Sequence, residues 1–197
     1  MDPGFLPYDW VKTKKFKYSY EEQLSGLAIR EDQFRFAETH KPPFASFSHR
    51  SGRYVIRADH ICVWVSNWIG KRNHKQFTLM LIYGVLYCLA LILWGVYLFP
   101  SIKTQTTLFL FTLVAMMFEL SFGSGMLIML ASNLYNLRMG KTQLQRWKNQ
   151  NLTNKGCCEN LKEICGDGPR FAWAIPTPAF GDDLRISYND DDENTLE

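Results

Sequence analysis

The pattern of apolar and polar positions divides the chain sharply. Residues 77–99 contain no charged side chain, and residues 104–137 contain one, Glu119. A helix needs about 20 apolar residues to cross the hydrocarbon core of a bilayer, and both stretches exceed that length. Two buried helices of a soluble domain would show the same runs, but a chain of 197 residues is too small to cover helices that are apolar all round. The pattern therefore predicts an α-helical integral membrane protein with two transmembrane helices.

Turn-forming residues divide the region before the first apolar run. Pro42, Pro43 and Gly52 break it into short extended or looped pieces, so we expect a small irregular domain there. The predicted order is a cytosolic domain, a transmembrane helix, a lumenal loop, a second transmembrane helix, a cytosolic tail segment and an acidic, disordered tail. These parts are assigned to residues 1–76, 77–99, 100–106, 107–135, 136–170 and 171–197.

The tail carries two local helical signals and a charged end. Leu144 and Trp147 extend a helical pattern that continues from the second apolar run. Residues 160–165 predict one short amphipathic helix that ends at Gly166. Acidic residues gather at the end of the chain, which is typical of a solvated, disordered tail.

Basic residues gather on one side of both predicted transmembrane helices. The loop between the helices contains a single basic residue, Lys103. The basic residues that flank the two other helix ends are Lys71, Arg72, Lys75, Arg138, Lys141, Arg146 and Lys148. The positive-inside rule therefore places both termini in the cytosol and the loop in the lumen or outside. The membrane is either an endomembrane of the ER or Golgi or the plasma membrane.

Charge and cysteine placement narrow the choice of partners and compartment. The net charge is only +3, and many of the basic residues lie beside the apolar runs, so we expect no nucleic-acid partner. Cys88 lies inside an apolar run, and the other four cysteines fall in segments predicted to be cytosolic. Thiols stay reduced in the cytosol, so no disulfide framework is expected.

The densest reactive cluster is Asp59-His60-Ile61-Cys62. Only the thiolate of a cysteine attacks, and at an ordinary pKa near 8.5 a small fraction is ionised at neutral pH. A neighbouring imidazole raises that fraction, and a carboxylate holds the imidazole in the right tautomer. In an extended segment residues two apart point to one side, which would place His60 and Cys62 together. Taken alone, the cluster is also compatible with a chance Asp-His pair beside a free thiol.

Basic residues surround this cluster next to the membrane surface. They are Arg53, Arg57, Lys71 and Arg72. They serve as the positive-inside signal, and they also suit an anionic substrate with an apolar tail. A fatty acyl-CoA fits this description, because its phosphates would meet the basic residues while its chain enters the bilayer.

Several blocks of sequence resemble the DHHC protein S-palmitoyltransferases. Residues 42–46 read Pro-Pro-Phe-Ala-Ser, and residues 59–77 follow the family core DHHCPWVNNCVGxxNYxxF at the same spacing. Residues 2–4 match the family's DPG motif, residues 140–145 lie where its TTxE motif follows, and residues 151–166 are similar to its carboxy-terminal motif. The resemblance covers nearly the whole chain in order.

The resemblance implies a site and a reaction. Cys62 would be the nucleophile, which takes palmitate from palmitoyl-CoA as a thioester and passes it to a cytosolic cysteine of a protein substrate. His60 would be the general base, and Asp59 would orient it. The CoA phosphates would bind Arg57, Lys71 and Arg72. Thioester exchange needs neither a metal nor a redox cofactor.

The chain departs from the family at its two structural zinc sites. Counted back from Cys62 without gaps, the ligand positions are Phe34, Ala37, Phe47 and Tyr54 for the first site and Ser48, Ser51, Ile61 and Trp68 for the second. None can ligate zinc, so no zinc is predicted. A structural zinc contributes about 10–16 kcal/mol to folding, and burying each large side chain contributes about 1.5–3 kcal/mol. We therefore expect a small aromatic core in place of the first site.

Two further departures bear on activity. The acidic position of TTxE is lost in Thr142-Gln143-Leu144-Gln145, and Thr142 is expected to keep its structural role. The family has four spans, and by the resemblance two would precede this chain. Two helices cannot enclose a sixteen-carbon chain, which leaves three alternatives: a truncated product, a chain that pairs with a helper subunit or family relative, or an inactive one. The leading hypothesis is an S-palmitoyltransferase, and the alternative is a non-catalytic membrane adaptor of the same family.

Overall fold

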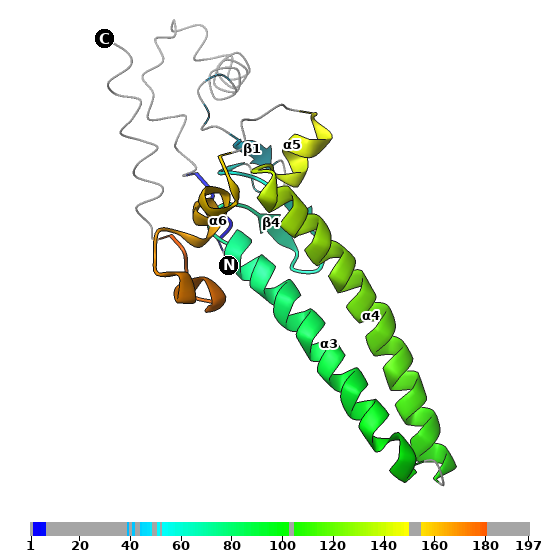
Figure 1. The fold of residues 1–197 in the computed structure, drawn as a ribbon. Helices are drawn as coiled ribbons and strands as arrows, with labels where there is room; N and C mark the ends of the chain where they lie inside the picture. The colour runs from blue at the N-terminus through cyan, green and yellow to red at the C-terminus, as the bar shows by residue number, and fades with distance from the viewer. Residues whose placement is uncertain are drawn as a thin grey trace, which may run out of the picture.

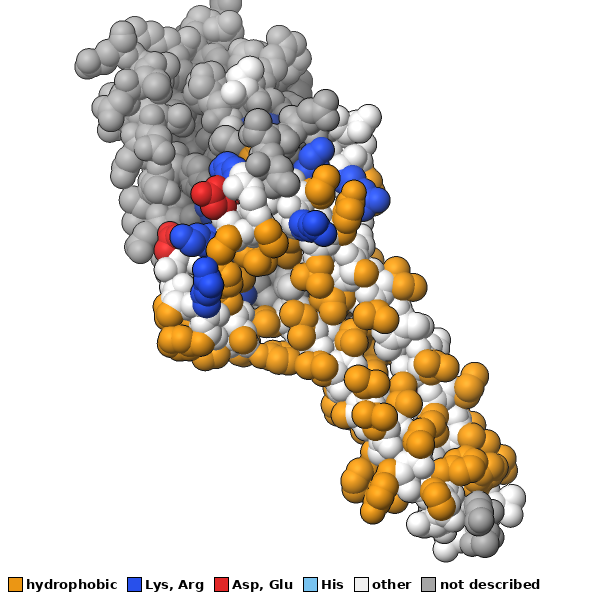
Figure 2. Space-filling model, viewed as in Figure 1, with side chains coloured by type: hydrophobic (Ala, Val, Ile, Leu, Met, Phe, Trp, Pro, Cys, Tyr) orange, Lys and Arg blue, Asp and Glu red, His pale blue; other side chains and the backbone are white. Residues whose placement is uncertain are grey.

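The computed structural model describes residues 2–6, 39, 41, 44–48, 51, 53–102, 105–149 and 155–180. Two long helices form an arm, and small hairpins and short helices gather at one end of it as a head (Figure 1). The predicted α-helical membrane architecture is confirmed, with two helices that are long and apolar enough to cross a bilayer. Basic side chains are grouped on the head, whereas the surface of the arm is apolar (Figure 2).

The arm is an antiparallel pair, α3 (His74–Ile102) and α4 (Thr106–Arg138). Both helices extend beyond the predicted spans of 77–99 and 107–135, and residues 74–76 and 136–138 carry them into the head. The helices approach closely where Gly84 faces Met126 and Gly95 faces Met116. Small residues at such contacts allow tight packing within a membrane. Most of the remaining surface of both helices is exposed.

The head contains two antiparallel hairpins, which is more order than the irregular domain expected. In the first, β1 (Ser46–Ser48) pairs with β2 (Arg53–Val55). In the second, β3 (His60–Cys62) pairs with β4 (Asn67–Ile69). Residues 4–6 run beside the first hairpin, where Leu6 donates a backbone hydrogen bond to Tyr54 at 2.8 Å.

The tail contains α5 (Gln143–Trp147), α6 (Cys157–Cys165) and the 3-10 helix η1 (Arg170–Ala174). The short helix expected over 160–165 is present within α6 and ends at Gly166. A continuous helix from the second span through Leu144 and Trp147 is not observed. The second span ends at Arg138, and Gly140 adopts a φ of 65°, a left-handed conformation that favours glycine and breaks the helix.

The expected boundary of the acidic tail at residue 171 is also wrong. Residues 171–180 form η1 and the segment after it, which packs against the start of α3. The segment contains no acidic residue, and it is held by hydrogen bonds from α3, so it is part of the folded head. Residues 181–197, where the acidic side chains are concentrated, lie outside the described residues.

Candidate functional site

The β3 strand presents the predicted nucleophile and base. Exposure alternates along it: His60 is half-buried, Ile61 is exposed and Cys62 is 2% exposed. Alternate residues of a strand point to one face, so this pattern is consistent with the expected placement of His60 and Cys62 on a common side. The imidazole of His60 also packs edge-on against Phe77, with ring centroids 5.1 Å apart.

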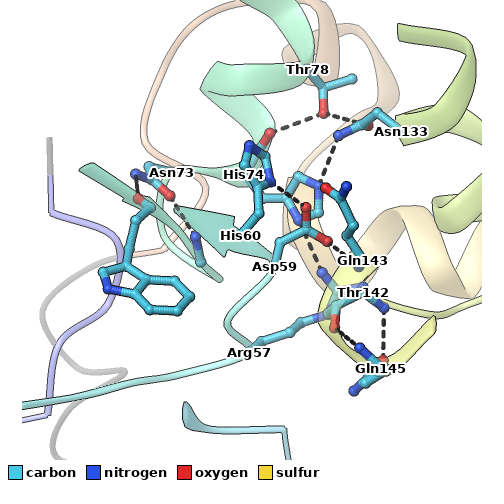
Figure 3. A network of polar contacts seen from close by, with 12 residues as sticks. Arg57, Asp59, His60, Asn73, His74, Thr78, Asn133, Thr142, Gln143 and Gln145 are labelled. Carbon is cyan, nitrogen blue, oxygen red and sulfur yellow. Dashed lines mark hydrogen bonds and ion pairs between the residues drawn. The ribbon is translucent and has the colours of Figure 1, made fainter. Parts of the chain in front are cut away.

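Asp59 is held from both directions by polar contacts (Figure 3). Its Oδ2 lies 2.8 Å from His60 Nδ1, and its Oδ1 accepts a 2.8 Å hydrogen bond from the backbone N–H of Gln143. The backbone carbonyl of Asp59 accepts a further bond from the N–H of Leu144 at 3.1 Å. The first two residues of α5 thus use their free amide groups to fix the residue that precedes the reactive strand.

These contacts keep the Asp59 carboxylate ionised. Burial by itself would raise the pKa of Asp59, but the hydrogen bonds from His60 and Gln143 oppose it, and the pKa is lowered from its ordinary value. An ionised carboxylate can only accept, so His60 Nδ1 carries a proton. In the neutral imidazole the lone pair is then on Nε2, the nitrogen that a general base needs.

A capping box at the start of α5 orients the amides that hold Asp59. The Thr142 hydroxyl accepts from the backbone N–H of Gln145 at 3.2 Å, and the Gln145 side-chain oxygen accepts from the backbone N–H of Thr142 at 2.7 Å. Glutamine serves in this motif as well as glutamate. The loss of the acidic residue therefore leaves the structural role of the motif intact.

A second polar layer lies beneath the site and was not predicted. Arg57 Nη1 lies 3.1 Å from His74 Nδ1, and the Asn133 amide lies 3.2 Å from His74 Nε2. Because a guanidinium can only donate, Nδ1 of His74 accepts and the imidazole is neutral. The Thr78 hydroxyl oxygen lies 3.0 Å from the His74 carbonyl oxygen and 3.2 Å from Asn133 Oδ1, and its single proton is donated to one of them. The layer joins the loop before β3 to both spanning helices.

Part of this layer had a signal in the sequence. Asn133 and Asn136 are polar residues three positions apart near the end of an apolar run, so they share one helix face. Polar residues in a predicted span face the protein interior more often than lipid. His74 had a weaker signal, because it lies among the positively charged residues before the first span, where a basic side chain is expected to be solvated.

The surroundings of Cys62 place it where the head meets the arm. It forms an apolar cluster with Ile69, Phe77 and Leu81, and side chains of α4 pack against this cluster. The α4 residues are Met126, Met129 and Leu130. The thiol is therefore buried beside the first turns of one spanning helix and the last third of the other.

A pocket of about 170 Å³ lies next to the cluster. The residues that line it are Asp59, His60, Phe77, Met129, Ser132, Asn133, Asn136 and Gln143. It is about as large as a cavity that holds benzene, so it accommodates only a small part of a fatty acyl chain.

The three basic residues expected to bind CoA phosphates have different surroundings. Arg57 is 5% exposed and pairs with His74 and, at 3.4 Å, with Glu163, so the expected phosphate contact does not fit its placement. Burial lowers the pKa of Lys71, and its Nζ lies 5.1 Å from the centre of the Phe180 ring.

The third residue, Arg72, is half-buried in the loop before α3. Its Nη1 donates to Asp2 Oδ2 at 2.7 Å, and Asp2 Oδ1 accepts from the N–H of Gly4 at 2.9 Å. The structure thus brings Asp59 and His60 into contact and places Cys62 on the same strand. It gives the three basic residues different partners: Arg57 contacts His74 and Glu163, Lys71 lies over the Phe180 ring, and Arg72 bonds Asp2.

The positions of the family's zinc ligands are occupied by side chains that cannot hold the metal. Phe47 and Tyr54 are cross-strand partners in the first hairpin, with ring centroids 5.1 Å apart. Ile61 and Trp68 are cross-strand partners in the second. Among the described residues no group of three or more His, Cys, Asp or Glu side chains is placed to bind a metal. Phe34 and Ala37, the other two positions of the first site, lie outside the described residues.

Comparisons with known proteins agree with this geometry. Residues 29–150 match the family model described as DHHC palmitoyltransferase. The chain is 28% identical over 161 residues to palmitoyltransferase ZDHHC15 of Rattus norvegicus, a match that covers 72% of this chain and 46% of that protein. It is 25% identical over 173 residues to palmitoyltransferase ZDHHC2 of the same species, covering 80% and 45%.

A plant protein shows a shorter and more similar match. Probable protein S-acyltransferase 13 of Arabidopsis thaliana is 34% identical over 93 residues, which cover 43% of this chain and 31% of that protein. The chain spans less than half the length of these curated relatives. Since the family model covers more than half of the chain and the two long apolar helices make it a membrane protein, the chain belongs to the DHHC palmitoyltransferase family.

Proposed function

We propose that this protein is a protein S-palmitoyltransferase that carries the acyl group on Cys62. The observation that supports this most directly is that the Asp59 carboxylate is hydrogen-bonded to His60 through one oxygen and to the backbone of α5 through the other. This arrangement prepares His60 to accept a proton on Nε2, on the strand that carries the thiol. Relatives named as palmitoyltransferases support the same chemistry.

The proposed reaction has two thioester exchanges. In the first, His60 takes the proton of Cys62, the thiolate attacks the carbonyl carbon of palmitoyl-CoA, and the C–S bond to CoA breaks. The departing CoA thiolate takes the proton from His60. In the second, His60 takes the proton of a cysteine thiol of a protein substrate, the resulting thiolate attacks the carbonyl carbon of the acyl-Cys62 thioester, the C–S bond to Cys62 breaks, and the Cys62 thiolate takes the proton back from His60. Atoms and charge balance without a metal or an oxidant.

The donor would approach along the membrane surface. Cys62 is surrounded by apolar side chains of both spanning helices, so an acyl chain bound to its sulfur would continue toward the bilayer. Lys71 and Arg72 remain the proposed ligands for the CoA phosphates, since both lie in the loop before α3. We assign Arg57 instead to the buried layer that supports the site.

The test is acyl transfer onto the purified full chain in detergent with a labelled palmitoyl-CoA analogue. We expect label that hydroxylamine removes, and we expect Cys62→Ala to abolish it. Cys88 is also a buried free thiol, so Cys88→Ala is the matched control and should retain full labelling. Equal label on the wild type and on Cys62→Ala would contradict the proposal and would indicate passive acylation of other cysteines.

A second candidate function is a non-catalytic membrane adaptor that binds a family relative or a client protein. Two observations favour it: Cys62 is 2% exposed, and the neighbouring pocket holds only a small part of an acyl chain. The same assay separates the two functions. An adaptor would show no Cys62-dependent label alone, but it would be recovered from membranes in a stable complex with its relative or client.

We also propose that the head folds without zinc. The cross-strand pairs Phe47–Tyr54 and Ile61–Trp68 occupy four of the ligand positions, and the rings of the first pair pack together. Elemental analysis of the purified protein should find well under one zinc per chain, and stoichiometric zinc would contradict this. For the topology, we propose that both termini are cytosolic, which accessibility of tags at the two ends in sealed vesicles would test.

A further inference from the structure

The last described part of the chain is an apolar segment attached to the first spanning helix. It comprises η1 and the residues up to Phe180, and it contains Phe171, Trp173 and Ile175. No acidic residue lies between Asp167 and Asp182. In Figure 1 this segment lies at the edge of the head that is nearest the arm, beside the start of α3.

Three side chains of α3 hold the segment in place. Lys75 is buried, and its Nζ donates to the backbone carbonyl and the hydroxyl oxygen of Thr177 at 3.1 and 3.3 Å. Gln76 donates to the same carbonyl at 3.3 Å. The Tyr83 hydroxyl donates to the carbonyl of Ala174. These bonds run along the first turns of the helix, so the segment follows α3 toward the membrane.

The bond from Tyr83 fixes how far the segment reaches. Tyr83 lies nine residues after His74, which corresponds to about 14 Å along a helix. The apolar run of α3 begins at Phe77, so residues 74–76 lie on the head side of it. Tyr83 lies six residues, or about 9 Å, into that run. The carbonyl of Ala174, which accepts from Tyr83, therefore lies within about 9 Å of the level at which the apolar run begins.

The outer face of the segment is apolar and open. Phe171 is 72% exposed and Ile175 is 45% exposed. Figure 2 shows apolar side chains along this edge of the head that run on into the apolar surface of the arm. Phenylalanine and isoleucine side chains at this depth suit the boundary between lipid headgroups and acyl chains. Arg170 begins the segment, and its exposed side chain is long enough to reach lipid phosphates.

We propose that residues 170–175 form an interfacial anchor that inserts Phe171 and Ile175 into the lipid surface beside α3. The partner is the phospholipid bilayer that contains the spanning helices, because the apolar face is continuous with theirs and is held near the start of the apolar run of α3. The anchor fixes the tail at the membrane level near which Cys62 lies. It depends on the membrane placement of α3 and does not require acyl transfer.

The test uses the full chain in phosphatidylcholine vesicles, with the photoreactive amino acid benzoylphenylalanine placed at one position at a time. Position 171 probes the anchor. Position 97, an exposed tyrosine within the span, is the positive control. Position 147 is the matched negative control, because Trp147 on α5 is 73% exposed and belongs to a different part of the head. After irradiation, mass spectrometry identifies phospholipid adducts on peptides that contain each position.

We expect lipid adducts at positions 171 and 97 and none at position 147. Adducts at position 97 without any at position 171 would overturn the proposal. Crosslinks from position 171 to another protein chain, in place of lipid, would assign the face to a protein partner and would also overturn it. Equal adducts at positions 147 and 171 would show that the face has no preference for lipid. Since no outcome depends on palmitoyl-CoA, failure here is distinct from failure of the proposed function.

Discussion

The two hairpins of the head have the same size and strand order but different supports. The first hairpin packs within its own region: Leu6, Ala45, Tyr54 and Ile56 form its core, and Phe47 packs against it. The second hairpin packs on the arm, because its buried residues contact side chains of α3 and α4. The first is therefore stabilised by its own apolar side chains, whereas the second takes its geometry from the spanning helices.

The reactive residues belong to the hairpin that packs on the spanning helices. Asp59, His60 and Cys62 belong to the hairpin that joins the head to both spanning helices and to α5. A site built at such a junction is positioned by several elements, which is what a preorganised nucleophile and base require. The first hairpin packs on its own apolar core, so we expect a change in that core to leave the reactive residues in place.

The largest expected effect is that of Asp59→Asn on acyl transfer. Asparagine can still accept from the Gln143 N–H, but its amide nitrogen donates to His60 and would leave the proton on Nε2, where it blocks the base. We expect the rate of label incorporation at Cys62 to fall by a factor on the order of 10³ to 10⁴, measured with the palmitoyl-CoA analogue. An unchanged thermal midpoint would show that the fold survives. A labelling rate within a few-fold of the wild-type rate would contradict a role for the Asp59–His60 contact in acyl transfer.

The second-largest expected effect is a loss of stability in the first hairpin. Tyr54→Ala removes a buried ring that packs on Phe47, and we expect the hairpin to lose about 3 kcal/mol of stability. Hydrogen exchange of the amides in residues 53–56 would measure this as faster opening. Phe47→Ala, which truncates the half-buried partner, should cost less. If the two hairpins are stabilised separately, amide hydrogen exchange in residues 60–62 should change little. Equally faster exchange in both hairpins would contradict separate stabilisation.

The smallest effect is expected at the cap of α5. Thr142→Ala removes the hydroxyl that accepts from Gln145, and it should destabilise α5 by about 1 kcal/mol. The loss should appear as faster hydrogen exchange in residues 143–147 and as a modest decrease in labelling of Cys62. Thr142→Ser and Gln145→Glu retain the capping box and should behave like the wild type. A serine variant as impaired as the alanine variant would mean that the methyl group, and not the cap, matters.

Much of the architecture could be read from local features of the chain. The two spanning helices follow from uncharged runs, and the extended reactive strand follows from its sequence between turn residues. The chain departs from these expectations where local and long-range signals conflict. Leu144 and Trp147 continue a helical pattern, but Gly140 and the cap at Thr142 start a new helix. Residues 171–180 precede an acidic end, yet they are folded because α3 supplies donors for their carbonyl groups.

The sequence by itself determined the two helices and the chemical identities of Asp59, His60 and Cys62, because apolar length and residue type are local properties. Only the tertiary structure decided what these residues contact. In the structure, Arg57 forms a buried pair with His74. The Gln145 side chain completes the capping box at the position where the family has an acidic residue. Burial and hydrogen-bond geometry depend on segments distant along the chain, so composition and spacing do not specify them.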